Sequence, residues 1–377
     1  MSELFPNVRF HQVQPSSIKS TYTEYDNVDF LIACGAGRSL VRNSVRIIGD
    51  LEIQSAAGVR ATGNILFDNK IGAHSFIESL QITTSQQGVV ENINNSYARY
   101  VGLAGIASFN ELDYCNAKHS CELKAPNEAV MLKYANGIAP FLTTATAVID
   151  DVDFSIKPMC ALNKMTGGDL PFNRSGTITL TTNLARNMSA LYGIEQDNAS
   201  LYLLKNLRCT FNSVPDSKTP STVQMRTIHP VKSNILSGNA SVSANVNAVC
   251  DAVSICVLQQ TNENVPKKNN YACENIKEFD QVSYLFNNQS NSLITYQIRD
   301  QTEVLERFIS SLYNTGHNQV SLSNFRANGG WGMGLDFDGN VDLSRNRFTM
   351  ELSSGVGSGA ANTPYVVWLY FHSQASI

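Results

Sequence analysis

The sequence predicts an all-β protein built from two tandem antiparallel β-sandwiches, each with a short helix. Many short runs alternate apolar and polar residues, as strands of roughly 5–8 residues do. Charged residues make up only 16% of the chain, and abundant Asn, Ser and Thr take their place, which favours turns and strands over long helices. A strand–turn–strand–helix unit also occurs twice, about 200 residues apart, which indicates a duplicated domain rather than a short solenoid repeat.

The first copy of this unit lies between Ile71 and Ala107. It comprises a strand over Phe76–Ile82, a polar turn at Ser85–Gly88 and a short apolar return at Val89–Ile93. A helix follows, carrying apolar residues between Tyr97 and Leu103. The switch from a period of two to a helical period marks the end of the strand pair.

The second copy lies between Asn275 and Thr315 and has the same order. Phe279–Phe286 is a strand, Asn287–Asn291 a polar turn, Leu293–Ile298 the return strand and Asp300–Tyr313 a helix. This helix is the clearest in the chain, because its first residue and Glu303 have the spacing of a capping box and its apolar residues share one face.

The remaining strands of the first half follow from alternation and β-branched residues. Gly49 and Asp50 mark a bulge or kink within one of them. The strands are expected at Val28–Ile32, Leu40–Ile53, Val148–Ile156, Gly176–Thr182 and Ser200–Ser213.

The second half begins after a polar, Pro-containing linker at Val214–Ser221. Its last strand, Tyr365–His372, is apolar on both faces, which is typical of a strand in the middle of a sheet. The other strands are expected at Val223–Ile228, Ala240–Val249, Ala252–Leu258 and Phe348–Leu352. The expected division is an N-terminal arm without periodicity over residues 1–21, a first domain over 22–215 and a second over 216–377.

The jelly roll, two Greek keys in eight strands, is the sandwich type that best accommodates long loops and a helix. We therefore expect two tandem eight-stranded antiparallel jelly rolls, each with a short helix. The weakly charged surface would suit burial against other subunits. A loop-rich all-β protein would have the same composition, so composition alone does not decide between these readings.

Charge and segment content exclude several classes of function. The net charge of −4 argues against a protein that neutralises nucleic-acid phosphates. We expect no secretory signal, because Glu3 lies in a start that leads into no apolar segment. The longest apolar stretch, Ala129–Ile149, is interrupted by Lys133 and Pro140 and is no membrane span. Eight scattered cysteines indicate reduced, mostly buried thiols made in a cytosolic or nuclear compartment.

Two clusters have residue types that bind metals. Cys115, His119 and Cys121 could supply three zinc ligands, but their spacing fits no standard zinc motif and no fourth ligand is near, so we favour a loop. Asp336, Asp338, Asn340 and Asp342 resemble the start of a calcium loop, but Gly339 and Arg347 occupy the wrong positions. We interpret Asp338–Asn340 as a turn between two strands, Met333–Phe337 and Val341–Leu343. We expect no metal site and no cofactor.

No catalytic signature is present in the sequence. The glycines of Cys34–Ser39 lack the Lys-Ser/Thr of a phosphate loop and are interpreted as turn residues. Asp150, Asp151 and Asp153 alternate with apolar residues along an expected strand, and we interpret them as part of its solvent-exposed face. The six histidines are dispersed: His11, His74, His119, His229, His317 and His372. We expect no enzyme activity and name no catalytic residue.

The order of elements resembles the double jelly-roll major capsid proteins of adenoviruses, tailless membrane-containing phages, virophages and polinton-like viruses. The resemblance covers nearly the whole chain as a pattern of elements. The segments that carry it are SLVRNSVRIIGDLEI, HSFIESLQITTSQQGVVENINNSYARYVGL, LPFNRSGTITLTTNL, NIKEFDQVSYLFNN, MGLDFDGNVDLSRNRFTMEL and the terminal YVVWLYFH. The chain is compact for this family, which implies short outer loops and no spike-forming insertion.

The resemblance implies a structural protein of the virion. Three copies of a two-domain chain would give a pseudo-hexagonal capsomer that tiles an icosahedral shell. Its expected partners are itself, neighbouring capsomers, penton and minor capsid proteins and an internal membrane, with no specific nucleic-acid binding. Residues 1–21 are expected on the inner face, against a neighbour. Two alternatives remain open: a β-sandwich attachment, spike or carbohydrate-binding protein, and a jelly-roll glycoside hydrolase with two carboxylates in a cleft.

Overall fold

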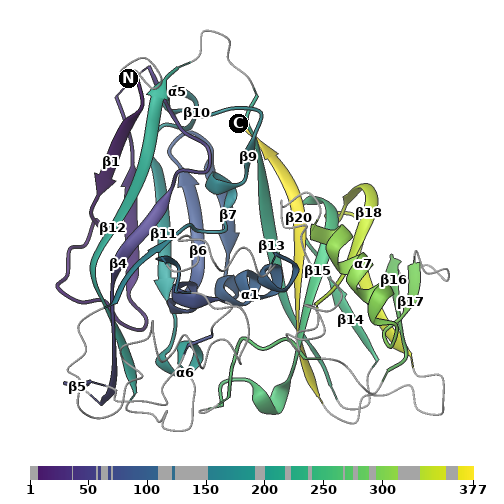
Figure 1. Ribbon diagram of the computed structural model, residues 1–377. Helices are drawn as coiled ribbons and strands as arrows, with labels where there is room; N and C mark the ends of the chain where they lie inside the picture. The colour runs from purple at the N-terminus through teal and green to yellow at the C-terminus, as the bar shows by residue number, and fades with distance from the viewer. Residues whose placement is uncertain are drawn as a thin grey trace. The chain divides into compact units, whose positions relative to one another are not determined.

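The computed structural model confirms an all-β architecture with few, short helices (Figure 1). It describes residues 7–35, 37–56, 58–60, 67–68, 71–108, 121–123, 152–191, 200–216, 222–236, 240–265, 268–274, 279–287, 294–312, 332–353 and 364–377. The expected segments at 109–120 and 124–151, and most of the linker at 217–221, lie outside the described residues.

The chain divides into two compact units. Unit 1 comprises Met1–Ala98, Tyr114–Thr227 and Gln374–Ile377, and unit 2 comprises Arg99–Asp113 and Ile228–Ser373. The helix α1 (Tyr97–Ser108) contributes its first two residues to unit 1 and its following residues to unit 2.

Eight principal strands of unit 2 belong to two sheets. One sheet has five strands in the order β18-β15-β20-β13-β9, in which the short β9 (Met165–Thr166) pairs with Gln224 and Met225 of β13. The other has four strands in the order β14-β19-β16-β17, and the pairings with recorded registers are antiparallel. The strands are β13 (Gln224–Ile235), β14 (Ser241–Ala244), β15 (Val249–Gln259), β16 (Gln281–Phe286), β17 (Ile294–Gln297), β18 (Gly332–Asp342), β19 (Phe348–Ser353) and β20 (Tyr365–Ser376).

Unit 1 also contains two sheets. The smaller has the order β2-β11-β6-β7, and in the larger β12 pairs with β1 and β4, while β4 also pairs with β8. The principal strands are β1 (Arg9–Val13), β2 (Asn27–Ile32), β4 (Arg46–Ala56), β6 (Ile77–Thr84), β7 (Gly88–Ile93), β8 (Val152–Ile156), β11 (Ile178–Leu184) and β12 (Leu201–Pro215). Shorter strands are β3 (Arg38–Leu40), β5 (Val59–Arg60), β9 (Met165–Thr166) and β10 (Leu170–Pro171).

The two units have the same strand order. Taking the eight principal strands of each unit in sequence, the first, eighth, third and sixth form one sheet, and the second, seventh, fourth and fifth form the other. This gives β1-β12-β4-β8 and β2-β11-β6-β7 in unit 1, as against β13-β20-β15-β18 and β14-β19-β16-β17 in unit 2. Eight antiparallel strands that form two sheets in this order make a jelly roll, and each unit has one. The structure therefore confirms the predicted fold class.

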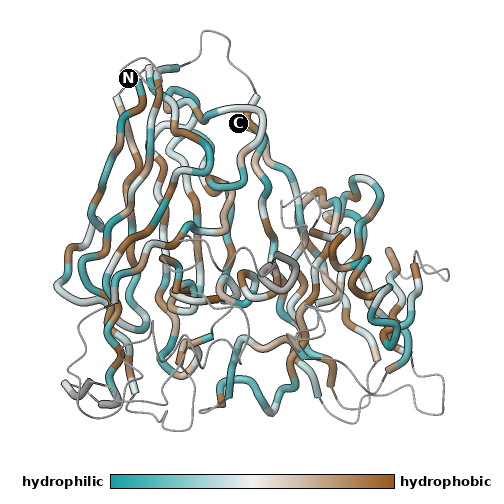
Figure 2. The backbone as a smooth tube through the Cα atoms, viewed as in Figure 1, coloured by the Kyte–Doolittle hydropathy of each residue, from teal (hydrophilic) through white to brown (hydrophobic). Residues whose placement is uncertain are grey.

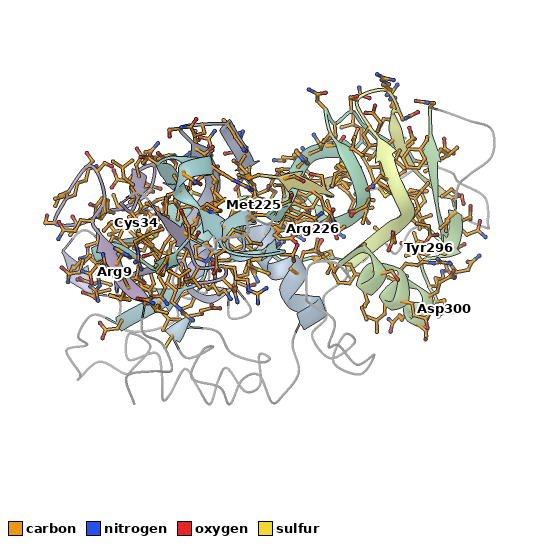
Figure 3. The ribbon with its side chains drawn as sticks, turned by 90° about the horizontal axis from the view of Figure 1, so that it is seen from above. Arg9, Cys34, Met225, Arg226, Tyr296 and Asp300 are labelled. Atoms are coloured by element: carbon orange, nitrogen blue, oxygen red, sulfur yellow. The ribbon has the colours of Figure 1, made fainter. Side chains whose placement is uncertain are left out.

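The repeated strand–turn–strand–helix unit is present in both halves as predicted. In the first half of the chain it is β6, β7 and α1; in the second half it is β16, β17 and α7 (Gln301–Leu312). Asp300 caps α7, since its Oδ1 accepts hydrogen bonds from the backbone N–H of Thr302 (3.0 Å) and Glu303 (3.3 Å). Figure 3 marks Asp300, at the start of α7, and Tyr296 on β17. The remaining helical turns are η1 (Gly72–Phe76), η3 (Ala161–Asn163), α5 (Phe172–Ser175), α6 (Asn187–Ala190) and η4 (Gln260–Asn262).

Each jelly roll has an apolar core between its two sheets. Apolar and polar residues alternate along the strands of unit 1 (Figure 2), and β11 follows this alternation with a buried residue at every second position. The terminal strand β20 is buried from Tyr365 to Ser373 and lies between β15 and β13, which confirms its predicted central place. Burying alternate side chains supplies the main stabilising term of each sandwich.

The structure differs from expectation at the N-terminus. Arg9–Val13, expected within the arm, forms β1 and pairs in register with Cys209–Ser213 of β12 (Figure 1). The half-exposed pattern of this five-residue strand gives no clear alternation, because β1 lies at a sheet edge with Phe10 turned to solvent. The first jelly roll therefore begins before Tyr22.

Two other local expectations need correction. Asp338–Asn340 is not a turn between two strands: β18 is continuous, and both of its ends pair with β15, with a register shift between Val341 and Asp336. Asp338, with φ of 54°, therefore belongs to a β-bulge. The irregularity expected at Gly49 lies on the partner strand, where the register shifts between Lys205 and Arg208.

Candidate assembly surface

Of the six exposed large apolar side chains among the described residues of unit 1, three lie on strands at sheet edges, whereas Val8, Ile18 and Tyr25 lie outside the strands. Phe10 on β1, Leu31 on β2 and Val89 on β7 are 68%, 51% and 58% exposed. The strands β2 and β7 end the four-stranded sheet, and within the described residues β1 pairs only with β12. An open edge with apolar side chains favours pairing or burial against another chain. These edges are therefore candidates for contacts between subunits.

A histidine–serine hydrogen bond joins the first and last strand of each jelly roll. His11 Nε2 on β1 lies 2.8 Å from Ser213 Oγ on β12, and His229 Nε2 on β13 lies 2.8 Å from Ser373 Oγ on β20. In both units the serine follows a phenylalanine by two residues, Phe211 in the first and Phe371 in the second. The two sandwiches thus share side-chain chemistry at equivalent places as well as strand order.

Both histidines are held toward the neutral form. Burial, followed by the charges of Arg38 and Arg9, lowers the pKa of His11, whose ring stacks on Phe211 with centroids 4.8 Å apart. Burial lowers the pKa of His229. Figure 3 labels Arg9 and Cys34, which belong to this part of unit 1; Cys34 Sγ lies 3.4 Å from His11 Nε2. A neutral imidazole can make these contacts without an acidic partner.

A serine and a histidine in the core of unit 2 also form a contact that resembles part of a catalytic dyad. Ser254 Oγ lies 2.8 Å from His372 Nε2 and 3.0 Å from Ser311 Oγ, and Ser311 donates to the carbonyl of Phe308 (2.7 Å). Ser254 and His372 are 0% and 1% exposed, so a substrate cannot reach the hydroxyl. The network joins β15, β20 and α7 in the core of unit 2 and is structural.

A second buried polar cluster lies in unit 1. His74 Nδ1 on η1 and Tyr97 Oη on α1 are 2.8 Å apart, and Tyr97 also accepts a hydrogen bond from the N–H of Met159 (3.1 Å). Glu122 Oε2 lies 3.6 Å from His74 Nε2. Burial raises the pKa of Tyr97 well above its usual value, so the phenol stays neutral. No sequence pattern indicated this cluster, because its members are far apart in the chain.

The sequence clusters that resembled metal sites do not form one in the part of the chain that the structure describes. No group of three His, Cys, Asp or Glu side chains there could hold an ion. Asp336 and Asp342 each accept a hydrogen bond from a backbone N–H two residues later, as residues of a turn or bulge do. Cys121 is exposed, whereas Cys115, His119, Asp150 and Asp151 lie outside the described residues. Asp153 is exposed on β8, opposite Asp50.

The core of unit 1 leaves a void of about 10 Å³, lined mainly by apolar side chains including Phe30, Phe76 and Phe154. Such a void holds at most one water molecule and no organic ligand. Among the described residues, no helix is long and apolar enough to cross a bilayer.

Several solved structures superpose on nearly the whole of this chain. The Faustovirus major capsid protein superposes with a TM-score of 0.63 at 8% identity, over 98% of this chain and 90% of that one. A chain of the PBCV-1 virus capsid gives 0.60 at 12% identity, over 98% and 95%. The mavirus major capsid protein gives 0.51 at 10% identity, over 98% and 90%.

This chain has the double jelly-roll fold of viral major capsid proteins. No protein-family model matches the sequence, and no curated protein sequence matches it. At 8–12% identity the shared feature is the fold. That fold spans both jelly rolls of the chain, as the sequence pattern predicted.

Proposed function

We propose that the protein is the major capsid protein of a virus and that it builds the virion shell. The observation that carries this proposal is the pair of jelly rolls with one strand order, matched over 98% of the chain by major capsid proteins. Fold alone does not imply function, but this two-domain arrangement has a geometric use. Three copies of a chain with two similar domains present six similar sides.

In this proposal the assembling unit is a homotrimer with a pseudo-hexagonal outline, which tiles an icosahedral shell. The apolar edge residues Phe10, Leu31 and Val89 support it, since an isolated chain would leave open sheet edges in water. The few charged residues, 16% of the chain, fit surfaces that become buried between subunits.

The proposed partners are other copies of this chain, neighbouring capsomers, penton and minor capsid proteins, and an internal membrane. The proposed location is the virion, after assembly in the reducing cytoplasm or nucleus of a host cell. The seven described cysteines are present as thiols, and five of them are buried, which is compatible with synthesis in a reducing compartment. We propose no catalytic role and no specific nucleic-acid binding.

The mass of the purified protein in solution tests the proposal. Size-exclusion chromatography with light scattering should give about 124 kDa, three times the chain mass of 41.3 kDa. A glycan array tests the alternative of a carbohydrate-binding attachment protein. A stable monomer that binds a defined glycan would replace the capsid proposal with that alternative.

A further inference from the structure

A buried site in unit 2 brings two thiols and one arginine together. Cys256 lies on β15, directly opposite Trp368 on the neighbouring strand β20. Directly opposed residues point to the same face of a sheet. The guanidinium of Arg99, from α1, lies over this face, with its carbon 3.6 Å from the Trp368 ring centroid and Nη1 4.0 Å from Cys256 Sγ.

The second thiol, Cys273, comes from the segment that follows η4. The recorded pairing of β15 with β18 ends at Cys256 and Gly332, and the segment around Cys273 approaches β15 just beyond this point. The N–H of Glu274 donates to the carbonyl of Val257 (2.7 Å), which places Cys273 next to Cys256. The two thiols lie close enough for each to affect the pKa of the other.

Arg99 also fixes the segment that carries Cys273. Its Nη2 donates to the carbonyl of Asn270 and its Nη1 to the carbonyl of Ala272 (3.2 Å). One buried cation, 3% exposed, thus contacts the sulfur of Cys256 and the backbone immediately before Cys273. The carboxylate of Glu274, near the site, accepts hydrogen bonds from the N–H of Gln259 (2.8 Å) and from Asn262 Nδ2 (2.6 Å).

The electrostatics make the two sulfurs unequal. Burial alone would raise the pKa of Cys256, but the hydrogen bond from the Cys273 thiol and the charge of Arg99 outweigh it and lower that pKa. Burial and the hydrogen bond to Cys256 raise the pKa of Cys273 well above its usual value. A cysteine of lowered pKa beside one of raised pKa is the arrangement of an attacking and a resolving cysteine.

We propose that Cys256 and Cys273 are an oxidation site, at which a small peroxide converts the two thiols into an intrachain disulfide. The Cys256 thiolate attacks one peroxide oxygen; an S–O bond forms, the O–O bond breaks, and the hydroxide that leaves takes up a proton to become water. The Cys273 sulfur then attacks the sulfur of the resulting sulfenic acid. The S–S bond forms, the S–O bond breaks, and the released hydroxide combines with the Cys273 proton.

The balance is two thiols and one peroxide to one disulfide and two waters, with two electrons passing from sulfur to oxygen. Cys256 and Cys273 are 1% and 7% exposed, which favours an oxidant as small as hydrogen peroxide over a bulky disulfide. The bond would close the loop between β15 and the Cys273 segment and restrict the unfolded chain. This inference does not depend on the proposed capsid role.

The test uses the full-length chain, reduced and then treated with hydrogen peroxide, with the remaining thiols alkylated before digestion and mass spectrometry. The expected product is a peptide pair linked through Cys256 and Cys273, lighter by two hydrogen atoms than the reduced pair. The melting temperature of the oxidised protein should rise by up to about 10 °C and return on reduction.

Single variants provide the controls. C256S and C273S should each abolish the linked peptide pair and the rise in melting temperature. The matched variant C209S removes another buried thiol, on β12, whose pKa burial raises to about 12, and it should retain both. The proposal is wrong if peroxide leaves both thiols free while it oxidises Cys34, if it carries Cys256 to sulfinic acid, or if it links other cysteines instead. These outcomes are measured on the wild-type chain, so they test the proposal even if a variant fails to fold.

Discussion

Helix α7 packs on β18 at a place where the strand has no side chain, and Gly332→Ala should disrupt this contact. A Cβ at Gly332 would lie 2.5 Å and 2.6 Å from Cε2 and Cε1 of the Phe308 ring, and closer still to Cζ. Real Cβ atoms essentially never approach another heavy atom within 3.0 Å. Phe308 is fully buried, so its ring cannot swing into solvent, and the helix must shift instead.

The cost follows from overpacking a core. Inserting a methyl group that forces such a shift typically destabilises by about 1–3 kcal/mol. For a domain of this size each kcal/mol lowers the melting temperature by about 2–4 °C. G332A should therefore lower the melting temperature by about 2–12 °C, measured by calorimetry on the purified protein, and should lower the urea midpoint without changing the m-value.

The same strand provides a matched control. Gly339 is exposed on β18 and a Cβ there would meet nothing within 4 Å, so G339A should change the melting temperature little. The double variant F308L/G332A should lose less stability than the sum of the two single variants, because the smaller side chain relieves the clash. Equal melting temperatures for G332A and G339A would refute the packing of α7 on β18 described above.

Three further predictions concern a cap, the two histidines and the first strand. D300A should cost about 1 kcal/mol of unfolding free energy, because Asp300 Oδ1 accepts two backbone N–H groups at the start of α7, whereas D300N should cost much less; urea titration of both variants checks this. The folded-state pKa values of His11 and His229 lie below the ordinary 6.5, so the unfolded chain binds protons first as pH falls; stability should be complete above pH 6.5 and decline below it. The H11Q/H229Q variant should show a shallower decline as the pH falls below 6.5, and an unchanged decline would assign the effect to other groups. Deletion of residues 1–13 removes β1 from β12 and should give aggregation or a lower melting temperature, whereas deletion of residues 1–6 leaves β1 intact and should not; equal behaviour of the two would contradict the pairing.

The sequence could predict those elements whose pattern is local. Asp300 and Glu303 lie three residues apart, the spacing of a capping box, and this predicted the start of α7. The run Tyr365–His372 is apolar on both faces because β20 is covered on both faces and paired on both edges. The repeated strand–turn–strand–helix unit was visible because each copy changes from a period of two along its strands to a helical period. These local rules were sufficient for the fold class.

What the sequence could not predict depends on pairing between distant segments. The strand β1 is short and half exposed, and only its register with Cys209–Ser213 identifies it. The bulge at Asp338 resembles a hairpin turn in sequence, since the same residue types tolerate positive φ in both. The His-x-Val and Phe-x-Ser segments around His11, Ser213, His229 and Ser373 do repeat in the sequence, and comparing the two halves residue by residue could have found them.

For the candidate sites as well, the sequence could indicate only groups of residues that lie close together in the chain. The clusters chosen by spacing, at Cys115–Cys121 and Asp336–Asp342, either lie outside the described residues or form a bulge. The buried groups of Arg99, Cys256 and Cys273 come together only because α1 and the segment after η4 meet the end of β15. These three residues are neighbours only in the folded chain, so no spacing pattern in the sequence could have indicated their cluster.

Electron microscopy of the purified protein tests the central claim most directly. Class averages should show particles with threefold symmetry and a near-hexagonal outline, in which six jelly rolls, two from each chain, can be placed in the density. Particles that hold one chain, or an oligomer without threefold symmetry, would contradict the proposal that this duplicated fold serves to build a shell.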